Sequence, residues 1–66
     1  MKLKMDKESD SLYFRLDESK IIESEEFQPG VILDFDKDNR VVGIEFLNVS
    51  TRANLEELQT IQLQTA

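Results

Sequence analysis

The sequence predicts an α+β fold, in which a small antiparallel β-sheet of four to five strands is followed by one short helix packed on the apolar face of the sheet. Three observations lead to this prediction. Up to residue 48 apolar residues recur at every second position, which is the spacing of half-buried strands. Polar turn segments divide these stretches into two hairpins. After Asn48 the apolar spacing changes to that of a helix.

The first hairpin is predicted from the spacing around a four-residue loop at positions 7–10. Because side chains alternate between the two faces of a strand, a slip of one residue would turn every apolar side chain of that strand toward solvent. The loop length avoids such a slip. The pairs that then share one face are Met5 with Leu12, Leu3 with Phe14 and Met1 with Leu16.

The second hairpin is predicted around a two-residue loop formed by Asp38 and Asn39, two residue types that tolerate positive φ. This loop again places the apolar side chains of both strands on one face. The pairs in this register are Phe35 with Val42, Leu33 with Ile44 and Val31 with Phe46.

Between the hairpins, residues 20–27 alternate poorly and are strongly acidic, which is typical of an edge strand whose charges prevent unwanted pairing. Alternatively, the acidic stretch from Glu23 to Glu26 is an edge that faces a partner protein. Pro29 and Gly30 favour a type II turn, whose twist fits a tight hairpin poorly. We therefore expect the chain to bend at this turn instead of folding straight back.

The C-terminal helix is predicted over residues 51 to about 59, with Ser50 or Thr51 as its N-cap and with Leu55 and Leu58 on one stripe. Residues 60–66 alternate as a strand or an extended tail would. With no repeat and no linker, residues 1–66 are expected to form a single domain, whose strand region covers residues 1–48.

The predicted apolar face is too wide for one helix to cover. Four or five strands about 4.8 Å apart span about 15 to 20 Å, whereas a helix covers about 10 to 12 Å. A second copy of the chain is the simplest cover, so the sequence predicts a homodimer. The face contains Met1, Leu3, Met5, Leu12, Phe14, Leu16, Val31, Leu33, Phe35, Val42, Ile44 and Phe46.

Composition limits the functions that this chain can have. It contains no histidine and no cysteine, which excludes Cys/His zinc sites, disulfides, thiol nucleophiles and imidazole bases. The net charge of −6 opposes binding to nucleic acid and to anionic membranes. The N-terminal residues lack the apolar run of a signal peptide. We expect a cytoplasmic, non-enzymatic protein without a cofactor, and a small basic protein would suit its charge.

One segment resembles a calcium-binding loop. Residues 34–45 match the EF-hand pattern except that Asn39 replaces the central glycine. An EF-hand needs a helix on each side, whereas strands are predicted here, so a plain β-turn is the preferred interpretation. No metal site is therefore assigned. The side chains that remain candidates for weak binding of a hard cation are Asp34, Asp36, Asp38 and Glu45.

A small basic cluster is predicted on the opposite face of the first hairpin, and it contains Lys2, Lys4, Tyr13 and Arg15. Such a cluster superficially resembles a platform for single-stranded nucleic acid. A single aromatic residue and the net negative charge favour a different interpretation, in which these side chains pair with nearby acidic groups such as Asp34, Asp36 or Glu45.

The ordered motifs of the chain resemble those of a bacterial family of unknown function, DUF2283. The residues that carry the resemblance are Met1-Lys2, Asp6-Lys7-Glu8, Asp10, Leu12-Tyr13, Glu23-Ser24-Glu25-Glu26, Pro29-Gly30-Val31-Ile32-Leu33-Asp34-Phe35-Asp36, Val42-Gly43-Ile44-Glu45-Phe46-Leu47, Ser50 and Arg52. The resemblance covers residues 1 to about 52. The chain departs from the family at Ser9 and Ser11, where alanine is usual.

The resemblance implies no activity, cofactor or catalytic residue. It does imply a small partner module, because some such genes lie beside RelE-like toxin genes. The leading hypothesis is a homodimeric protein-interaction module without enzymatic activity. The alternative is an antitoxin-like acidic partner of a small basic RelE-like toxin.

Overall fold

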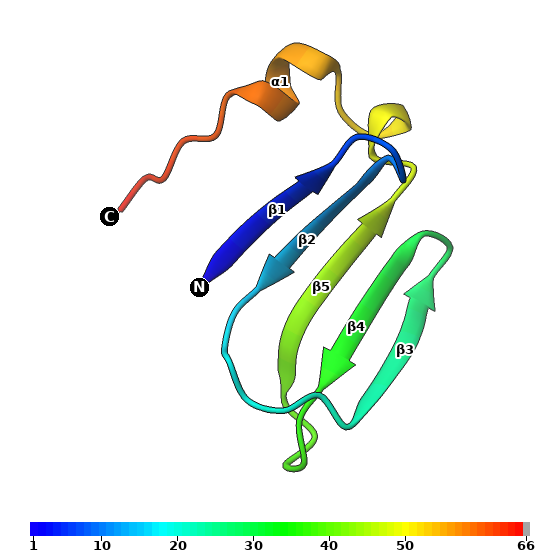
Figure 1. Ribbon diagram of the computed structural model, residues 1–66, viewed down its shortest axis with the longest axis vertical. Coiled ribbons are helices and arrows are strands. Elements are labelled where there is room, and N and C mark those ends of the chain that lie inside the picture. The colour runs from blue at the N-terminus through cyan, green and yellow to red at the C-terminus, as the bar shows by residue number, and fades with distance from the viewer. Residues whose placement is uncertain (66) are drawn as a thin grey trace.

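The computed structural model describes residues 1–65, and its main feature is one antiparallel sheet of five strands (Figure 1). The strands are arranged in the order β1-β2-β5-β4-β3, so β5 is central and β1 and β3 are the two edges. This confirms the predicted fold class. The elements are β1 (Lys2–Asp6), β2 (Ser11–Arg15), β3 (Glu23–Gln28), β4 (Val31–Phe35), β5 (Val41–Leu47), a 3-10 turn (Val49–Thr51) and helix α1 (Leu55–Gln59).

The first hairpin has the predicted register. Leu3 lies opposite Phe14, and Met5 lies opposite Leu12. The turn at residues 7–10 is held by the carboxylate of Asp6, which accepts hydrogen bonds from the backbone N–H groups of the residues two and three positions later, at 3.0 and 3.3 Å. The predicted pair of Met1 and Leu16 lies beyond the ladder, because β1 begins at residue 2.

The second hairpin confirms two of its three predicted pairs and corrects the third. Val31 lies opposite Phe46 and Leu33 opposite Ile44, but a bulge after Asp34 pairs Phe35 with Val41 instead of Val42. The cause is the loop length.

The backbone N–H of Asp36 donates to the carbonyl of Arg40 at 3.0 Å, which leaves the three residues 37–39 in the loop. Of the two residues predicted to accept positive φ, Asn39 alone does so, at 61°. A three-residue loop with one left-handed residue and an adjoining bulge is a common hairpin connection. The predicted two-residue loop is therefore wrong.

Strand β3 is an edge strand, as predicted, and all six of its residues are exposed. The expectation of a bend at Pro29 and Gly30 is wrong, because β3 folds straight back onto β4 with Gln28 opposite Val31. Gly30 has φ 81°, which the third position of a type II turn requires. The register shifts between Glu26 and Gln28, and this bulge accommodates the twist that the turn imposes.

The C-terminal helix is shorter than predicted and has a different cap. It begins at Leu55, and the side chain of Asn54 caps it by accepting a hydrogen bond from the N–H of Glu57 at 2.8 Å. Ser50 and Thr51, the predicted caps, lie in the 3-10 turn instead. The predicted end at residue 59 is correct. The predicted stripe of Leu55 and Leu58 includes one side chain, that of Leu55, that lies outside the described residues.

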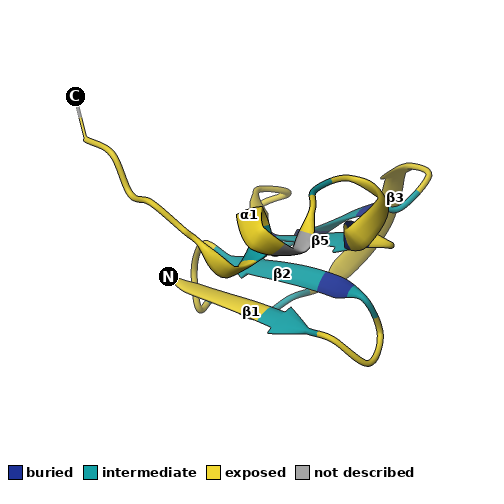
Figure 2. Ribbon diagram, turned by 90° about the horizontal axis from the view of Figure 1, so that it is seen from above, coloured by how far each residue is buried: buried dark blue, intermediate teal, exposed yellow. Residues whose placement is uncertain are grey.

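The sheet is a single layer, and α1 lies near one end of it (Figure 2). The molecule measures 36 × 31 × 19 Å. Residues 60–65 extend away from the helix without joining a strand. Among the described side chains, which exclude that of Leu55, the buried apolar ones are Val31, Val42 and Val49, and no large one is fully buried. The helix therefore covers only a small part of the sheet.

Candidate functional site

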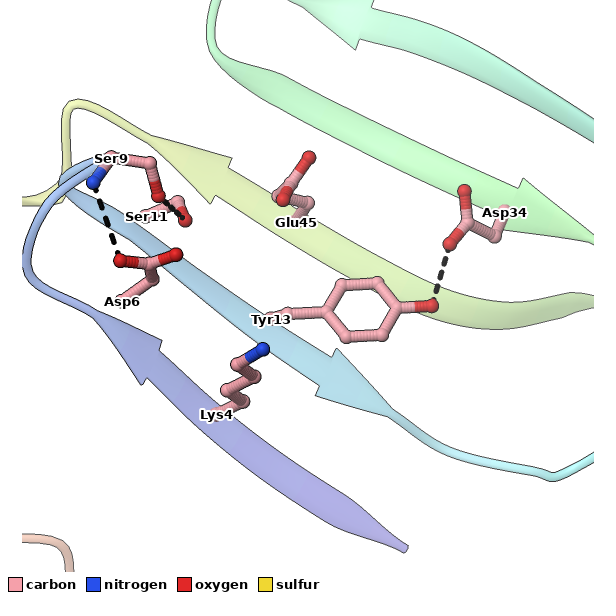
Figure 3. A pocket seen from close by; sticks show the side chains of 7 residues that line it. All are labelled: Lys4, Asp6, Ser9, Ser11, Tyr13, Asp34 and Glu45. Carbon is pink, nitrogen blue, oxygen red and sulfur yellow. Dashed lines mark hydrogen bonds between the residues drawn. The ribbon is translucent and has the colours of Figure 1, made fainter.

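The polar side of the sheet carries a hydrogen-bonded group of three residues from three different strands. The hydroxyl of Tyr13 on β2 reaches over β5 and donates to Asp34 Oδ2 on β4 at 2.7 Å (Figure 3). From β3, the hydroxyl of Ser24 donates to Asp34 Oδ1 at 2.6 Å. Asp34 is only 8% exposed, and both of its carboxylate oxygens have donors. The group therefore joins β2, β4 and β3 across the polar side and passes over β5.

Gly43 on the central strand makes this arrangement possible. It lies directly between Arg15 of β2 and Asp34 of β4 in the register of the sheet. A Cβ atom at this position would overlap the hydroxyl of Tyr13 and approach Asp34 Oδ2 to 2.9 Å. A residue with a side chain would therefore displace the tyrosine. The absence of a side chain at residue 43 is a requirement of the Tyr13–Asp34 hydrogen bond.

The electrostatics of this group keep the tyrosine protonated. Burial raises the pKa of Tyr13 above its usual value of 10.0, and donation to the carboxylate of Asp34 raises it further. Arg15 Nη1 lies 3.4 Å from the same hydroxyl and donates to it. The hydroxyl thus accepts from a cation and donates to an anion, which fixes the orientation of its proton.

A shallow hollow of about 390 Å³ lies beside this group on the polar side (Figure 3). Lys4 and Glu45 lie opposite Tyr13 on its two neighbouring strands. The hydroxyls of Ser9 and Ser11 are 2.8 Å apart and share a hydrogen bond. Together with Asp6 and Asp34 these residues line the hollow, whose polar groups carry both signs of charge.

The four predicted cation ligands are divided between two places. Asp34 and Glu45 both line the hollow on the polar side, and Asp34 also accepts from Tyr13 and Ser24. Within residues 1–65, the structure contains no group of three or more acidic side chains placed to hold a metal ion. The side chains of Asp34, Asp36 and Asp38 each have hydrogen-bond or ion-pair partners within the sheet or the turn.

The remaining two ligands of that pattern, Asp36 and Asp38, belong to the β4–β5 turn. Asp36 Oδ1 accepts from the backbone N–H groups of Asp38 and Arg40, both at 2.9 Å. The side chain of Arg40 lies 3.4 Å from Asp36 and 3.3 Å from Asp38. The N–H of Arg40, followed by the other donors and the guanidinium charge, lowers the pKa of Asp36 below its usual 3.8. This carboxylate is a structural acceptor of the turn.

The basic cluster predicted on the polar side is dispersed in the structure. Tyr13 pairs with Asp34, as predicted, but Lys2 lies 3.6 Å from Glu18 instead of the acidic groups expected. The guanidinium of Arg15 donates to the backbone carbonyls of Asp17, at 2.5 Å, and of Ser19. These contacts hold the segment that follows β2.

The apolar side of the sheet is ordered in rows that cross all five strands. The register places five residues in a central row, which contains Leu3, Phe14, Ile44, Leu33 and Glu25 in spatial order. The row ends at one edge in Leu3, which is 40% exposed, and at the other in a carboxylate. Phe14, Phe35 and Phe46 are only half-buried. The apolar face therefore leaves its large side chains only partly covered.

The acidic edge strand borders that face directly. Glu23 lies opposite Phe35 and Glu25 opposite Leu33, so both carboxylates are on the apolar side. Charged groups that point inward at an edge discourage uncontrolled pairing. One side of β3 thus limits the apolar face, while Ser24 and Glu26 belong to the polar side.

A family model described as a protein of unknown function (DUF2283) matches residues 2–50, a range that contains all five strands. The chain belongs to the DUF2283 family. No curated protein and no solved structure matches the chain. Helix α1 lies beyond the part that this DUF2283 chain shares with the family model. In the described part of the chain, no helix has the length and apolar character needed to cross a membrane.

The sequence predicted that the basic cluster pairs with acidic groups such as Asp34, but not that Tyr13, Asp34 and Ser24 form one group, although one signal for the close approach of Tyr13 was present. An isolated glycine within an alternating strand indicates a close approach by another group, and Gly43 is such a glycine. The position of Ser24 gave no signal, because β3 alternates poorly and its register depends on the bulge.

Proposed function

We propose that this protein is a non-enzymatic interaction module that forms a homodimer through its apolar face. The observation that carries the proposal is the incomplete burial of the sheet's aromatic side chains. Phe14, Phe35 and Phe46 are half-buried in the single chain, although aromatic residues of this size usually supply most of a small domain's core. A second copy stacked on this face would complete their burial.

The surface area of the chain agrees with this proposal. The accessible surface is 5335 Å², whereas a folded monomer of 7.7 kDa is expected to expose about 4300 Å². The excess of about 1000 Å² is divided between the extended residues 60–65 and the single-layer sheet. A standard interface buries about 800 Å² per partner. A second copy would cover the part of this excess that belongs to the sheet, whereas residues 60–65 contribute to the excess separately.

The absence of enzymatic activity is supported by the chemistry of the polar side. The chain has no histidine or cysteine, and the buried carboxylate of Asp34 has donors on both oxygens. The tyrosine beside it stays protonated at neutral pH. Neither group is free to act as a general base.

The experiment that tests the dimer is light scattering combined with unfolding at several protein concentrations. A dimer that becomes more stable as its concentration rises supports the proposal. A 7.7 kDa monomer that stays cooperatively folded on dilution would reject it. Leu33→Glu, which places a charge in the centre of the face, should give a monomer or an unfolded chain, while Glu26→Gln on the polar side should leave the dimer unchanged.

A second candidate function is that of an antitoxin-like acidic partner of a small basic RelE-like toxin. The observation that favours it is β3, an edge strand with three glutamates and six exposed residues in a chain of net charge −6. An exposed edge can accept a strand from a partner. Titration of such a toxin with the protein, and with a variant in which Glu23, Glu25 and Glu26 are glutamine, tests this. Equal binding by both proteins would reject a role for the acidic edge.

A further inference from the structure

This inference rests on the proposed dimer and concerns its geometry. Two copies that stack the same face must be related by a two-fold axis lying between the sheets. If the axis runs along the strands, β3 of each copy lies over β1 of its partner. If it runs across the strands, β3 lies over β3 and β1 over β1. The charges at the two edges distinguish these arrangements.

The two edges of the apolar face differ in charge. At the β3 edge, Glu23 and Glu25 are both on the apolar side and exposed. At the β1 edge, Leu3 and Met5 are on the apolar side, and Lys2 and Lys4 alternate with them. The side chains of both lysines belong to the polar side, where Lys4 lines the hollow and Lys2 lies 3.6 Å from Glu18, so β1 contributes Leu3 and Met5, and no carboxylate, to the apolar side.

We propose that the two copies pack with their two-fold axis along the central strand β5, so that the acidic edge of each lies over the β1 edge of its partner. With the axis across the strands, two carboxylates from each copy would meet at one edge of an apolar interface. Like charges placed together at an interface that excludes water oppose association. The proposed axis separates the two acidic edges and places each over the β1 edge of the partner, which has no carboxylate on its apolar side.

The central row of the apolar face predicts one contact between the two copies of the proposed dimer. Leu3 and Glu25 are at the two ends of the same row, with Ile44 of β5 in the middle. Rotation about an axis along β5 therefore brings Glu25 of one copy over Leu3 of the other. Stacked sheets lie about 10 Å apart and cross at about 30°. A flexible crosslinker can span that separation.

The test uses the absence of native cysteine. Leu3→Cys and Glu25→Cys are prepared as single variants, refolded separately and as a mixture, and treated with a flexible bismaleimide. The mixture should give a crosslinked dimer, and neither variant alone should. Crosslinking of Glu25→Cys with itself, or of Leu3→Cys with itself, would overturn the proposed axis. The matched control is Glu26→Cys, the polar-side neighbour, which should not crosslink with Leu3→Cys.

The outcomes separate the geometry from the dimer itself. A dimer by light scattering that fails to crosslink the mixture overturns the geometry alone. A monomer by light scattering rejects the proposed function together with it. Crosslinking of Glu26→Cys as strongly as of Glu25→Cys would indicate edge-to-edge pairing and would also overturn the stacked arrangement.

The dissociation constant of the Glu25→Gln dimer tests the direction of the two-fold axis independently. With the proposed axis, Glu25 faces the uncharged Leu3 of the partner, so the effect of the change should differ by less than about twofold between low and high salt. With the axis across the strands it would remove a repulsion between the two copies of Glu25, so a tightening of the dimer that is much larger at low salt than at high salt would overturn the proposal. Glu26→Gln is the control and should leave the constant unchanged.

Discussion

The two faces of this sheet satisfy their side chains in different ways. On the polar side, Tyr13, Ser24 and Asp34 complete one another's hydrogen bonds within a single chain, and Gly43 leaves the space that they need. On the apolar side, large side chains from four strands lie side by side and stay half-buried. Hydrogen bonds are satisfied by a few directed partners, whereas apolar burial needs a second layer. The polar side is complete in the monomer, and the apolar side is not.

The largest expected effect comes from truncating the apolar face. Phe46 lies opposite both Leu12 and Val31, in the middle of the sheet. Phe46→Ala should lower the free energy of unfolding by about 3 to 5 kcal/mol in the dimer, as loss of a buried aromatic does. Urea unfolding at two protein concentrations checks this. If the loss were the same at both concentrations and the protein stayed monomeric, the apolar face would not be shared between copies.

A smaller loss is expected at Gly43. In Gly43→Ala the new Cβ would displace the Tyr13 hydroxyl and leave the buried carboxylate of Asp34 with one donor fewer. The free energy of unfolding should fall by about 1 to 3 kcal/mol. Tyr13→Phe removes the displaced oxygen, so the double variant should lose less than the sum of the two single losses. Strict additivity would contradict the proposed role of the glycine.

The sequence predicts the pairing within each hairpin better than it predicts the arrangement of the whole sheet. The alternation of apolar residues determined the register of the first hairpin and two pairs of the second, because a slip would expose every apolar side chain. It did not determine the strand order, since the pairing of β2 with β5 joins segments that are distant in the sequence. The β4–β5 bulge was missed because it depends on a turn stabilised by Asp36, whose backbone contacts no periodicity reveals.

The N-cap of the helix and the place of Ser24 in the polar group were missed for a related reason. Asn54 competes with Ser50 and Thr51 as a cap, and the choice among them depends on tertiary contacts. Ser50 is held instead by Asp10, whose carboxylate accepts its hydroxyl at 2.7 Å. The Tyr13–Asp34 bond spans 21 residues and crosses an intervening strand. Local patterns predict which face a residue occupies, but not its partner on that face.

The tyrosine offers a direct probe of the polar side, because Tyr13 is the only tyrosine and the chain has no tryptophan. Its raised pKa means that the folded state keeps the proton more tightly than the unfolded state. The stability that it contributes is therefore complete below pH 10.0 and is lost as the pH rises through the folded pKa. Titration by ultraviolet absorbance should give a midpoint above 10.0 in the folded protein and near 10.0 in urea.

Tyr13→Phe measures how much the tyrosine hydroxyl contributes to stability. It removes one hydrogen bond to a carboxylate and should lower the free energy of unfolding by about 1 to 2 kcal/mol at neutral pH. The alkaline loss of stability in the window above pH 10.0 should be reduced in this variant. A tyrosine that titrates at its ordinary value in the folded protein would show that the polar side is open to solvent and not self-contained.

The smallest effect is expected at the β4–β5 turn, where the polar and apolar sides meet. The pKa of Asp36 is lowered, first by the N–H of Arg40, so the folded state favours the ionised carboxylate. Its contribution is present above pH 3.8 and is lost as the pH falls through the lower folded pKa. Asp36→Asn should therefore destabilise the protein at neutral pH and converge with the wild type in acid. Asp38→Asn, whose carboxylate accepts from no backbone group, is the matched control and should change stability less. Thermal unfolding between pH 2 and 7 measures both variants, and a destabilisation of Asp36→Asn that is equal at both ends of this range would show that the carboxylate acts through packing and not through its charge.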